Sequence, residues 1–230
     1  MNELLLVLQL VVFYGMVILS YRLFGKRGLY GWTVMATIAA NIEVLVQIHA
    51  FGMDMTLGNI LFASTFVVTD ILSEVSGKRD AHRAVHLGVY TSLMFIIISQ
   101  SWLLFTPNGE DFAMPHIRAI FQNTPRLMLT SLLVYAIVQR FDVFMYHTIW
   151  GWTEKLCHDR KRFLWLRNNA ATLISQLLNN ILFTFGAFYG VFETSSLWSI
   201  VWSSMVIFIV TSLADTPVVY ICRRMKVVEA

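Results

Sequence analysis

The chain has 230 residues, of which 57% are hydrophobic and only 13% are charged, and its mean hydropathy is +0.64. This composition excludes a water-soluble domain of ordinary kind, because the apolar residues also come in long runs rather than in alternation with polar ones. The formal net charge of +3 is small. Basic residues that face the anionic cytoplasmic leaflet of a membrane explain this charge, so it does not require a nucleic-acid partner.

A helix that crosses the hydrocarbon core of a bilayer needs about 20 mostly apolar residues. The stretches that meet this requirement are residues 3–21, 29–49, 57–76, 84–105, 127–149, 168–190 and 197–221. The sequence therefore predicts an all-α, polytopic integral membrane protein with about seven transmembrane helices. Met1 to Glu3 lack the basic lead-in of a cleavable signal peptide, so the first helix is expected to remain as an anchor.

Lysine and arginine gather in alternate loops between these spans. If the N-terminus lies outside, all 17 basic residues except Arg118 and Arg126 fall in inner loops or in the C-terminal tail. The positive-inside rule then predicts an outside N-terminus and a cytoplasmic C-terminus. Cys157 and Cys222 are far apart, with no CxxC spacing and no histidine at ligand spacing, so neither a disulfide nor a metal site is expected.

In the second and third spans, ionisable side chains stand out, because charges in a bilayer are rare and usually face a cavity or a partner. Asn41 and Glu43 lie about 200° apart on a regular helix, so they cannot share one pocket unless that helix is distorted. Asp70 lies roughly 20 Å inward from the outer end of the third span, past the midplane. Glu74, near the inner boundary, has two interpretations: a partner of Lys78 four residues on, or a functional group at an inner gate.

The later spans carry polar stripes at helical spacing. The fifth span has Ser131, Tyr135, Gln139, Asp142 and Tyr146, and the sixth has Thr172, Gln176, Asn179, Asn180 and Phe183. One such stripe can join two helices, but two indicate a shared polar interior. The seventh span adds Asp215 on the face of Ser204 and Thr211, and Pro217 bends that helix, as is typical of broken membrane helices that line a cavity.

Four segments together point to a family. They are "LGNILFASTFVVTDILSEVSGKRDAHRAV" at Leu57 to Val85, "ANIEVLV" at Ala40 to Val46, "RLMLTSLLVYAIVQRFDVFMY" at Arg126 to Tyr146 and "LRNNAATLISQLLNNILF" at Leu166 to Phe183. The first, with its Thr-Asp, Ser-Glu and glycine-basic steps, resembles the most characteristic segment of the vitamin uptake transporter family, the queuosine precursor transporters. The sequence departs from that family's pattern at Asn179, where aspartate is frequent, near Ile207, where lysine is frequent, and at Asp215.

The resemblance implies import of 7-deazaguanines, namely queuine and 7-cyano- or 7-aminomethyl-7-deazaguanine, for tRNA modification. A guanine-like base offers adjacent N–H donors for a carboxylate, a carbonyl for an amide and a flat face for an aromatic ring. The candidate substrate-binding residues are Asn41, Asp70, Glu74, Tyr135, Gln139, Asp142, Gln176, Asn179, Asn180 and Asp215. Asp70 is expected to face the central cavity and to accept the N–H edge of the base.

The resemblance also sets the expected organisation. Residues 1–230 form a single transmembrane transporter domain, in which residues 1–27 are an added first helix and residues 28–226 a six-helix core. The expected partners are a small 7-deazaguanine and the lipid bilayer of the cell membrane, with no nucleic acid, cofactor or catalytic residue. The sequence leaves a homo-oligomer open.

Three other classes of membrane protein share some of these features. A substrate-binding subunit of an energy-coupling-factor vitamin transporter would have a similar number of helices, and copurification with ATPase subunits would identify it. A seven-helix photoreceptor fails, because no lysine lies at mid-membrane to form a retinal Schiff base. An intramembrane enzyme is disfavoured, because no Gly-x-Ser-x-Gly, His-Glu-x-x-His or paired intramembrane Asp motif is present.

Overall fold

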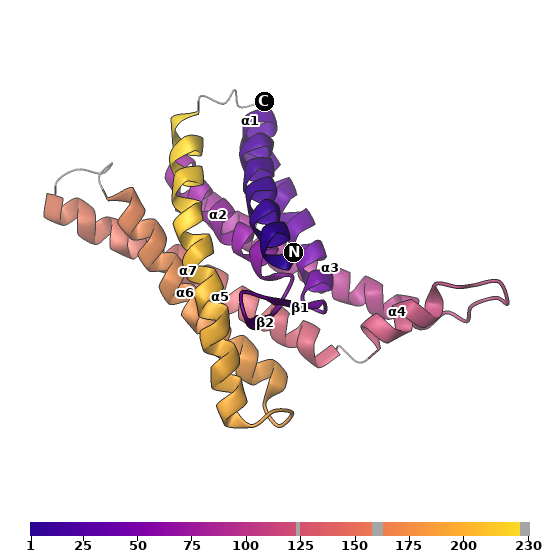
Figure 1. Cartoon of the computed structure of the whole chain (residues 1–230). Coiled ribbons are helices and arrows are strands. Elements are labelled where there is room, and N and C mark those ends of the chain that lie inside the picture. The colour runs from indigo at the N-terminus through magenta and orange to yellow at the C-terminus, as the bar shows by residue number, and fades with distance from the viewer. Residues whose placement is uncertain (123–124, 158–162, 226–230) are drawn as a thin grey trace.

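The computed structural model describes residues 1–122, 125–157 and 163–225, and helices dominate them (Figure 1). The helices are α1 (Asn2–Glu43), α2 (Asn59–Val75), α3 (Lys78–Trp102), α4 (Met114–Phe121), α5 (Pro125–Cys157), α6 (Leu164–Phe188) and α7 (Thr194–Arg224). A hairpin of β1 (Gln47–Ala50) and β2 (Met53–Thr56) separates α1 from α2. Among the described residues five helices, α1, α3, α5, α6 and α7, are long and apolar enough to cross a membrane, so the predicted all-α membrane class is confirmed.

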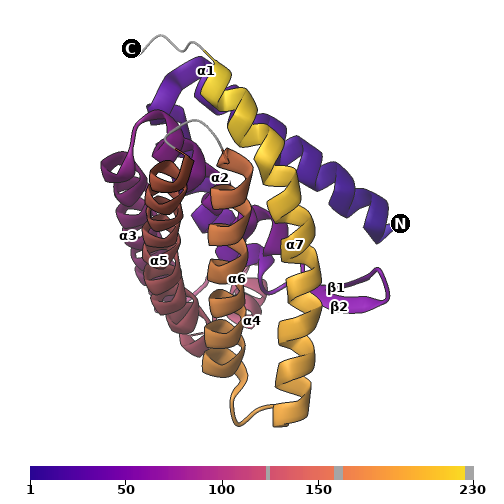
Figure 2. The same ribbon diagram turned by 90° about the vertical axis from the view of Figure 1, so that its left-hand side faces the viewer.

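Helix α1 folds back on itself at Gly25. Its 42 residues would extend for about 63 Å as a straight helix, roughly twice the hydrocarbon thickness. Gly25 has φ 58° and ψ −144°, a conformation that residues with a Cβ strongly disfavour. The rings of Phe13 and Trp32 lie edge to face with their centroids 6.1 Å apart, whereas a straight helix would separate these residues by about 28 Å. Helix α1 therefore consists of two packed arms, residues 2–24 and 26–43 (Figure 2).

The expectation of a helix over residues 29–49 is wrong at its end. Helix α1 stops at Glu43, and Gln47 and His49 lie on β1 instead. Phe51 and Gly52 both have positive φ, which makes the two-residue turn that antiparallel strands need. Hydropathy cannot separate an apolar helix from an apolar strand, which is why the sequence did not reveal the hairpin.

The first residues of α1 hold the hairpin in place. The Asn2 side-chain amide donates to the His49 carbonyl oxygen at 2.9 Å, and the Phe51 N–H donates to the Glu3 carboxylate at 3.3 Å. The N-terminus therefore lies beside the hairpin (Figure 2).

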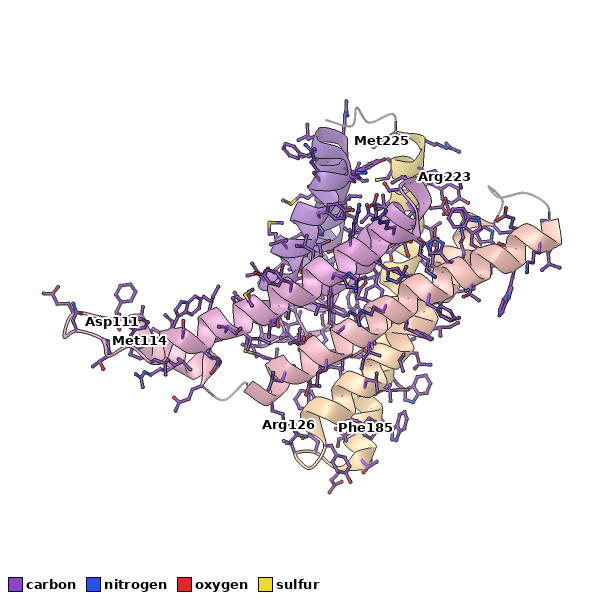
Figure 3. The ribbon with its side chains drawn as sticks, turned by 180° about the vertical axis from the view of Figure 1, so that it is seen from behind. Asp111, Met114, Arg126, Phe185, Arg223 and Met225 are labelled. Carbon is purple, nitrogen blue, oxygen red and sulfur yellow. The ribbon has the colours of Figure 1, made fainter. Side chains whose placement is uncertain are left out.

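The helix bundle has two chemically different ends. The basic end contains the Gly25 turn, the α2–α3 junction, the start of α6 and the end of α7. Two ion pairs at 3.5 Å bring these segments together: Lys26 with Asp80, and Arg223 with Glu74. At the hairpin end lie the N-terminus, the hairpin and the α6–α7 turn. Figure 3 shows Arg126 and Phe185 at the hairpin end, and Arg223 and Met225 at the opposite one.

Helix α4 is a short helix with Pro115 in its first turn. Its Phe121 packs edge to face on Phe95 and Trp102, with centroids 6.1 and 5.7 Å apart, so α4 is attached to α3. The main apolar core lies elsewhere, where Trp32 of α1, Ile71 of α2 and Val219 of α7 are buried together.

The turn in α1 yields a stability prediction. Gly25→Ala places a Cβ in a glycine-only conformation and should lower the free energy of unfolding by about 1–3 kcal/mol. Gly15→Ala is the matched control, because a Cβ there meets no atom within 4 Å and alanine suits a helix interior. Thermal unfolding of the purified variants in detergent measures both. Equal unfolding temperatures for the two variants would show that Gly25 is not needed for the turn.

Candidate functional site

A cavity of about 690 Å³ lies within the bundle and opens at the hairpin end. Both arms of the hairpin line it, and so do residues of α1, α2, α3, α5, α6 and α7. His49 and Asp54, which form an ion pair at 2.8 Å when the histidine is protonated, stand at its edge with side chains that are 66% and 85% exposed. The cavity therefore communicates with solvent at this end.

The cavity wall combines aromatic rings with uncharged hydrogen-bonding groups. The aromatic residues are Phe62, Tyr135, Phe183, Phe188, Phe192 and Phe208, and the amides are Asn41, Gln47, Asn59, Asn179 and Asn180. Pockets of this volume and composition bind flat, mostly apolar small molecules that carry a few polar groups.

Tyr135 is held in the wall by a close approach between α5 and α3. A Cβ built on Gly88 would lie 2.1 Å from the Tyr135 hydroxyl oxygen, so a larger residue at position 88 would displace the tyrosine. The rings of Phe62 and Tyr135 meet edge to face with centroids 6.0 Å apart. Thr37 and Thr65 lie near the hydroxyl, which gives this end of the ring polar neighbours.

The structure divides the ten residues expected from the sequence into two groups. Asn41, Tyr135, Asn179 and Asn180 line the cavity. The others lie outside its lining and are Asp70, Glu74, Gln139, Asp142, Gln176 and Asp215. Gln139 is one hydrogen bond behind the wall, since its side-chain amide donates to the Thr65 hydroxyl at 2.8 Å. The polar stripes thus extend from the cavity into the protein interior.

Three carboxyl groups form what we name the carboxylate layer: Asp70 of α2, Asp142 of α5 and Asp215 of α7. Each residue is at most 1% exposed. Asp70 accepts a hydrogen bond from the Thr172 hydroxyl at 3.2 Å and lies within electrostatic range of Asp142 and Asp215. The carboxylate oxygens of Asp142 and Asp215 are fully buried, and their polar neighbours are the hydroxyl groups of Ser175 and Tyr14. In the described conformation Asp70 is behind the cavity wall, so its predicted contact with substrate stays a prediction.

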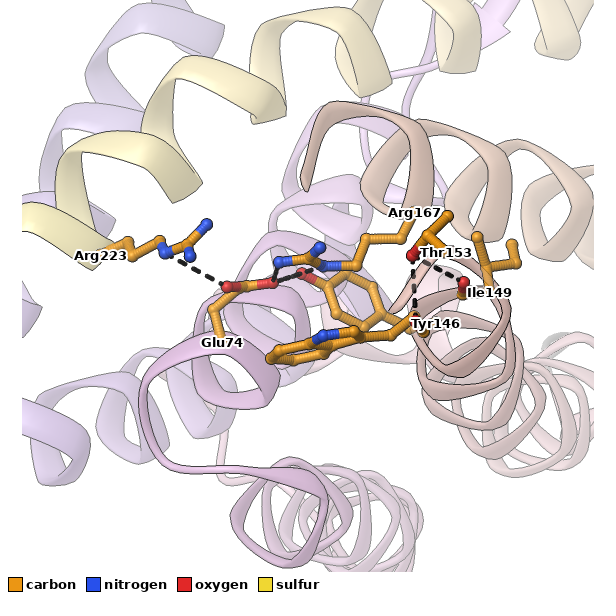
Figure 4. A network of polar contacts seen from close by, with 7 residues as sticks. Glu74, Tyr146, Ile149, Thr153, Arg167 and Arg223 are labelled. Carbon is orange, nitrogen blue, oxygen red and sulfur yellow. Dashed lines mark hydrogen bonds and ion pairs between the residues drawn. The ribbon is translucent and has the colours of Figure 1, made fainter. Parts of the chain in front are cut away.

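Beyond the layer, Glu74 is the centre of a buried ion-pair network at the basic end (Figure 4). Its carboxylate accepts a hydrogen bond from the Arg167 Nε at 2.6 Å, also pairs with the Arg167 Nη2, and accepts one from the Tyr146 hydroxyl at 2.8 Å. Arg223 of α7 lies 3.5 Å from the second carboxylate oxygen, and the Arg167 guanidinium lies 4.2 Å from the centroid of a Trp150 ring. The network joins four helices: α2, α5, α6 and α7.

This network corrects one of the two interpretations of Glu74. Among the described residues its ion-pair partners are Arg167 and Arg223 rather than Lys78, whose Nζ lies 5.9 Å from the Phe144 ring centroid. Glu74 points into the bundle, where only another helix can supply a cation. Sequence reasoning missed Arg167, because it is 93 residues away and no local spacing connects the two. The signal available in the sequence was an arginine directly before the apolar stretch at residues 168–190.

No three His, Cys, Asp or Glu side chains lie close enough to hold a metal ion within the part of the chain that the structure describes.

Comparison with known proteins gives the family. The family model described as "Putative vitamin uptake transporter" matches residues 56–222. The chain belongs to the vitamin uptake transporter family. It is 35% identical over 215 residues to a protein of Bacillus subtilis (strain 168) named "Probable queuosine precursor transporter". The aligned region covers 94% of this chain and 92% of that relative. No solved structure matches the chain.

The resemblance deduced from the four segments is thereby confirmed. This vitamin uptake transporter is a multi-pass cell-membrane protein that carries a small molecule, and it is not an enzyme.

The buried network predicts a strong effect on stability. Arg167→Leu leaves the carboxylate of Glu74 buried with only part of its partners and should cost about 3–5 kcal/mol of unfolding free energy. Arg83→Leu is the control: the arginine is 53% exposed, and its partner Asp80 keeps a second cation, Lys26 at 3.5 Å, so the loss should be smaller, about 1 kcal/mol. Thermal unfolding in detergent compares the two variants. Equal losses would mean that Arg167 contributes no more to stability than a half-exposed arginine does.

Proposed function

We propose that this transporter imports queuosine precursors, namely queuine and 7-cyano- or 7-aminomethyl-7-deazaguanine, for use in tRNA modification. The observation that carries the proposal is the cavity, in which aromatic faces and side-chain amides surround a space of about 690 Å³. The name of the Bacillus subtilis relative supports the same substrate class.

The wall chemistry suits such a base. Phe62 and Tyr135 offer aromatic surface for a flat heterocycle. Asn41, Asn179 and Asn180 each supply both a donor and an acceptor, which match the carbonyl and the N–H groups of a guanine-like edge. These uncharged groups bind the base without burying a charge against it.

We further propose that the two groups of site residues act in succession. The cavity is accessible at the hairpin end, while the Glu74 network closes the basic end. A substrate held by the cavity residues reaches Asp70, Gln139, Asp142, Gln176 and Asp215 when the network around Glu74 separates. In this scheme Glu74 acts at the gate rather than on the base.

The proposed topology has seven crossings: the two arms of α1, then α2, α3, α5, α6 and α7. The N-terminus at the hairpin end and the end of α7 at the basic end support an odd number of crossings. The charge distribution supports an outside N-terminus. Residues 1–27 then form the helix added to a six-helix core of residues 28–226, although the added arm contributes Tyr14 and Val17 to the main apolar core.

The topology can be tested with reporters. A periplasm- or exterior-active reporter fused before Met1 and a cytoplasm-active reporter fused after Ala230 should both be functional, because seven crossings place the ends on opposite sides. Exchanging the two reporters is the control and should silence both. Two ends that report the same side would contradict the seven-crossing arrangement.

The function is tested by uptake of labelled queuine and its two precursors into cells that lack their own synthesis and import, with this chain as the sole transporter. We expect accumulation of at least one base. Asn179→Leu should weaken binding by about 1–3 kcal/mol, or roughly 5- to 150-fold, because a polar group of the base loses its partner.

The control for this variant is Leu133→Ala, since Leu133 is an exposed apolar residue of α5 that does not line the cavity. It should leave uptake unchanged at equal membrane expression. Failure of the parent to accumulate any of the three bases would remove the proposed substrate class.

A further inference from the structure

The carboxylate layer lies between the cavity and the Glu74 network, and cavity binding alone does not explain it. Asp70, Asp142 and Asp215 come from three different helices and are buried together inside a membrane protein. Ionised carboxylates within electrostatic range of one another in a medium of low dielectric repel one another and lose their hydration, so such a group requires a compensating positive charge.

The described residues that surround the layer supply little such charge. The charges that act most strongly on Asp70 are Asp142 of α5, Asp215 of α7 and Glu74 of its own helix, all of them negative. Tyr14 of α1 lies beside Asp215, and Tyr146 of α5 lies within range of Asp70. Helix α6 contributes Arg167 and α7 contributes Arg223, and both pair with Glu74. The charged residues of α3 from Lys78 to Arg83 lie in its first two turns, at the basic end.

Neutral polar side chains are also buried at the layer. The Ser175 hydroxyl is fully buried beside Asp142. Both side-chain amide atoms of Gln176, on the same helix, are buried without a hydrogen-bond partner among the described residues. A carboxylate only accepts hydrogen bonds, whereas a protonated carboxyl group also donates one. Protonation would therefore lower the charge of the layer and supply a donor to its unpaired oxygens.

We propose that Asp70, Asp142 and Asp215 bind the proton that this transporter carries together with its substrate, so that import is proton symport. The proton enters from the cavity side, resides on a carboxyl group of the layer and leaves at the basic end when the Glu74 network separates. No covalent bond to substrate forms, and each cycle moves one proton in the direction of import. Because Asp70 is one helical turn from Glu74, a proton on Asp70 removes a negative charge next to the network.

The presence of the proton can be measured without any substrate. Infrared difference spectroscopy of the purified protein at neutral pH should show the C=O stretch of a protonated carboxyl group. At least one of Asp70→Asn, Asp142→Asn and Asp215→Asn should remove that band. Glu110→Gln, which alters an exposed carboxylate in the loop before α4, is the matched control and should retain it. A parent protein without the band at neutral pH would overturn the proposal.

The coupling of proton movement to substrate import rests on the proposed function. It is measured in proteoliposomes with 7-cyano-7-deazaguanine, a neutral base, at zero membrane potential. A gradient of one pH unit, acidic at the hairpin end, is worth about 1.4 kcal/mol and should drive about tenfold accumulation in one-for-one symport. The variant that loses the infrared band should lose this accumulation and retain counterflow exchange of labelled base.

The outcomes separate the two proposals. Counterflow in the parent with accumulation indifferent to the pH gradient would overturn symport and leave the substrate class standing. Absence of counterflow for all three bases would overturn the substrate class, and the infrared band would still decide whether the layer holds a proton.

Discussion

The buried ion pair between Glu74 and Arg167 determines the shape of the interior. A carboxylate at this depth is costly unless a cation and further donors satisfy it, and here they come from α5, α6 and α7. The four helices must therefore converge at the basic end. Convergence at one end of a bundle leaves the other end wider, and the aromatic and amide-lined cavity occupies that space. The cavity and the closed end are thus two results of one electrostatic requirement.

Polarity is graded along the interior from the hairpin end to the basic end. Neutral amides surround the cavity in the first zone. Acidic groups without cations form the second zone, and the ion pairs of Glu74 with its arginines form the third. A neutral molecule meets little electrostatic resistance in the first zone. The second zone favours positive charge, and the third contributes its own cations. Such a gradient suits the proposed binding of a neutral base and of a proton at different depths, which would separate the two binding events in space.

The sequence predicted those features that depend on local pattern, and it missed those that depend on contacts between distant residues. Apolar runs located the long helices, because the length of a membrane-spanning apolar segment is visible locally. Helical spacing also placed Gln139 and Asp142 on an interior face. Spacing gives the face of a helix but not how close the neighbouring helix approaches. It therefore could not tell that Asn179 borders the cavity while Gln176, one turn away, does not. The partnership of Glu74 with Arg167 and the backbone of the hairpin were hidden for the same reason.

The turn at Gly25 bears on how the chain enters the bilayer during synthesis. Two arms that meet at a single glycine cannot be inserted independently, so they enter as one helical hairpin. Its tip carries Arg22, Lys26 and Arg27, and each would cost about 2.5–3.5 kcal/mol at the bilayer centre on translocon-derived scales. In the proposed topology the tip stays on the side of the ribosome while the apolar arms cross. The orientation of every later helix would then be settled within the first 43 residues, before any cavity residue beyond Asn41 has been synthesised.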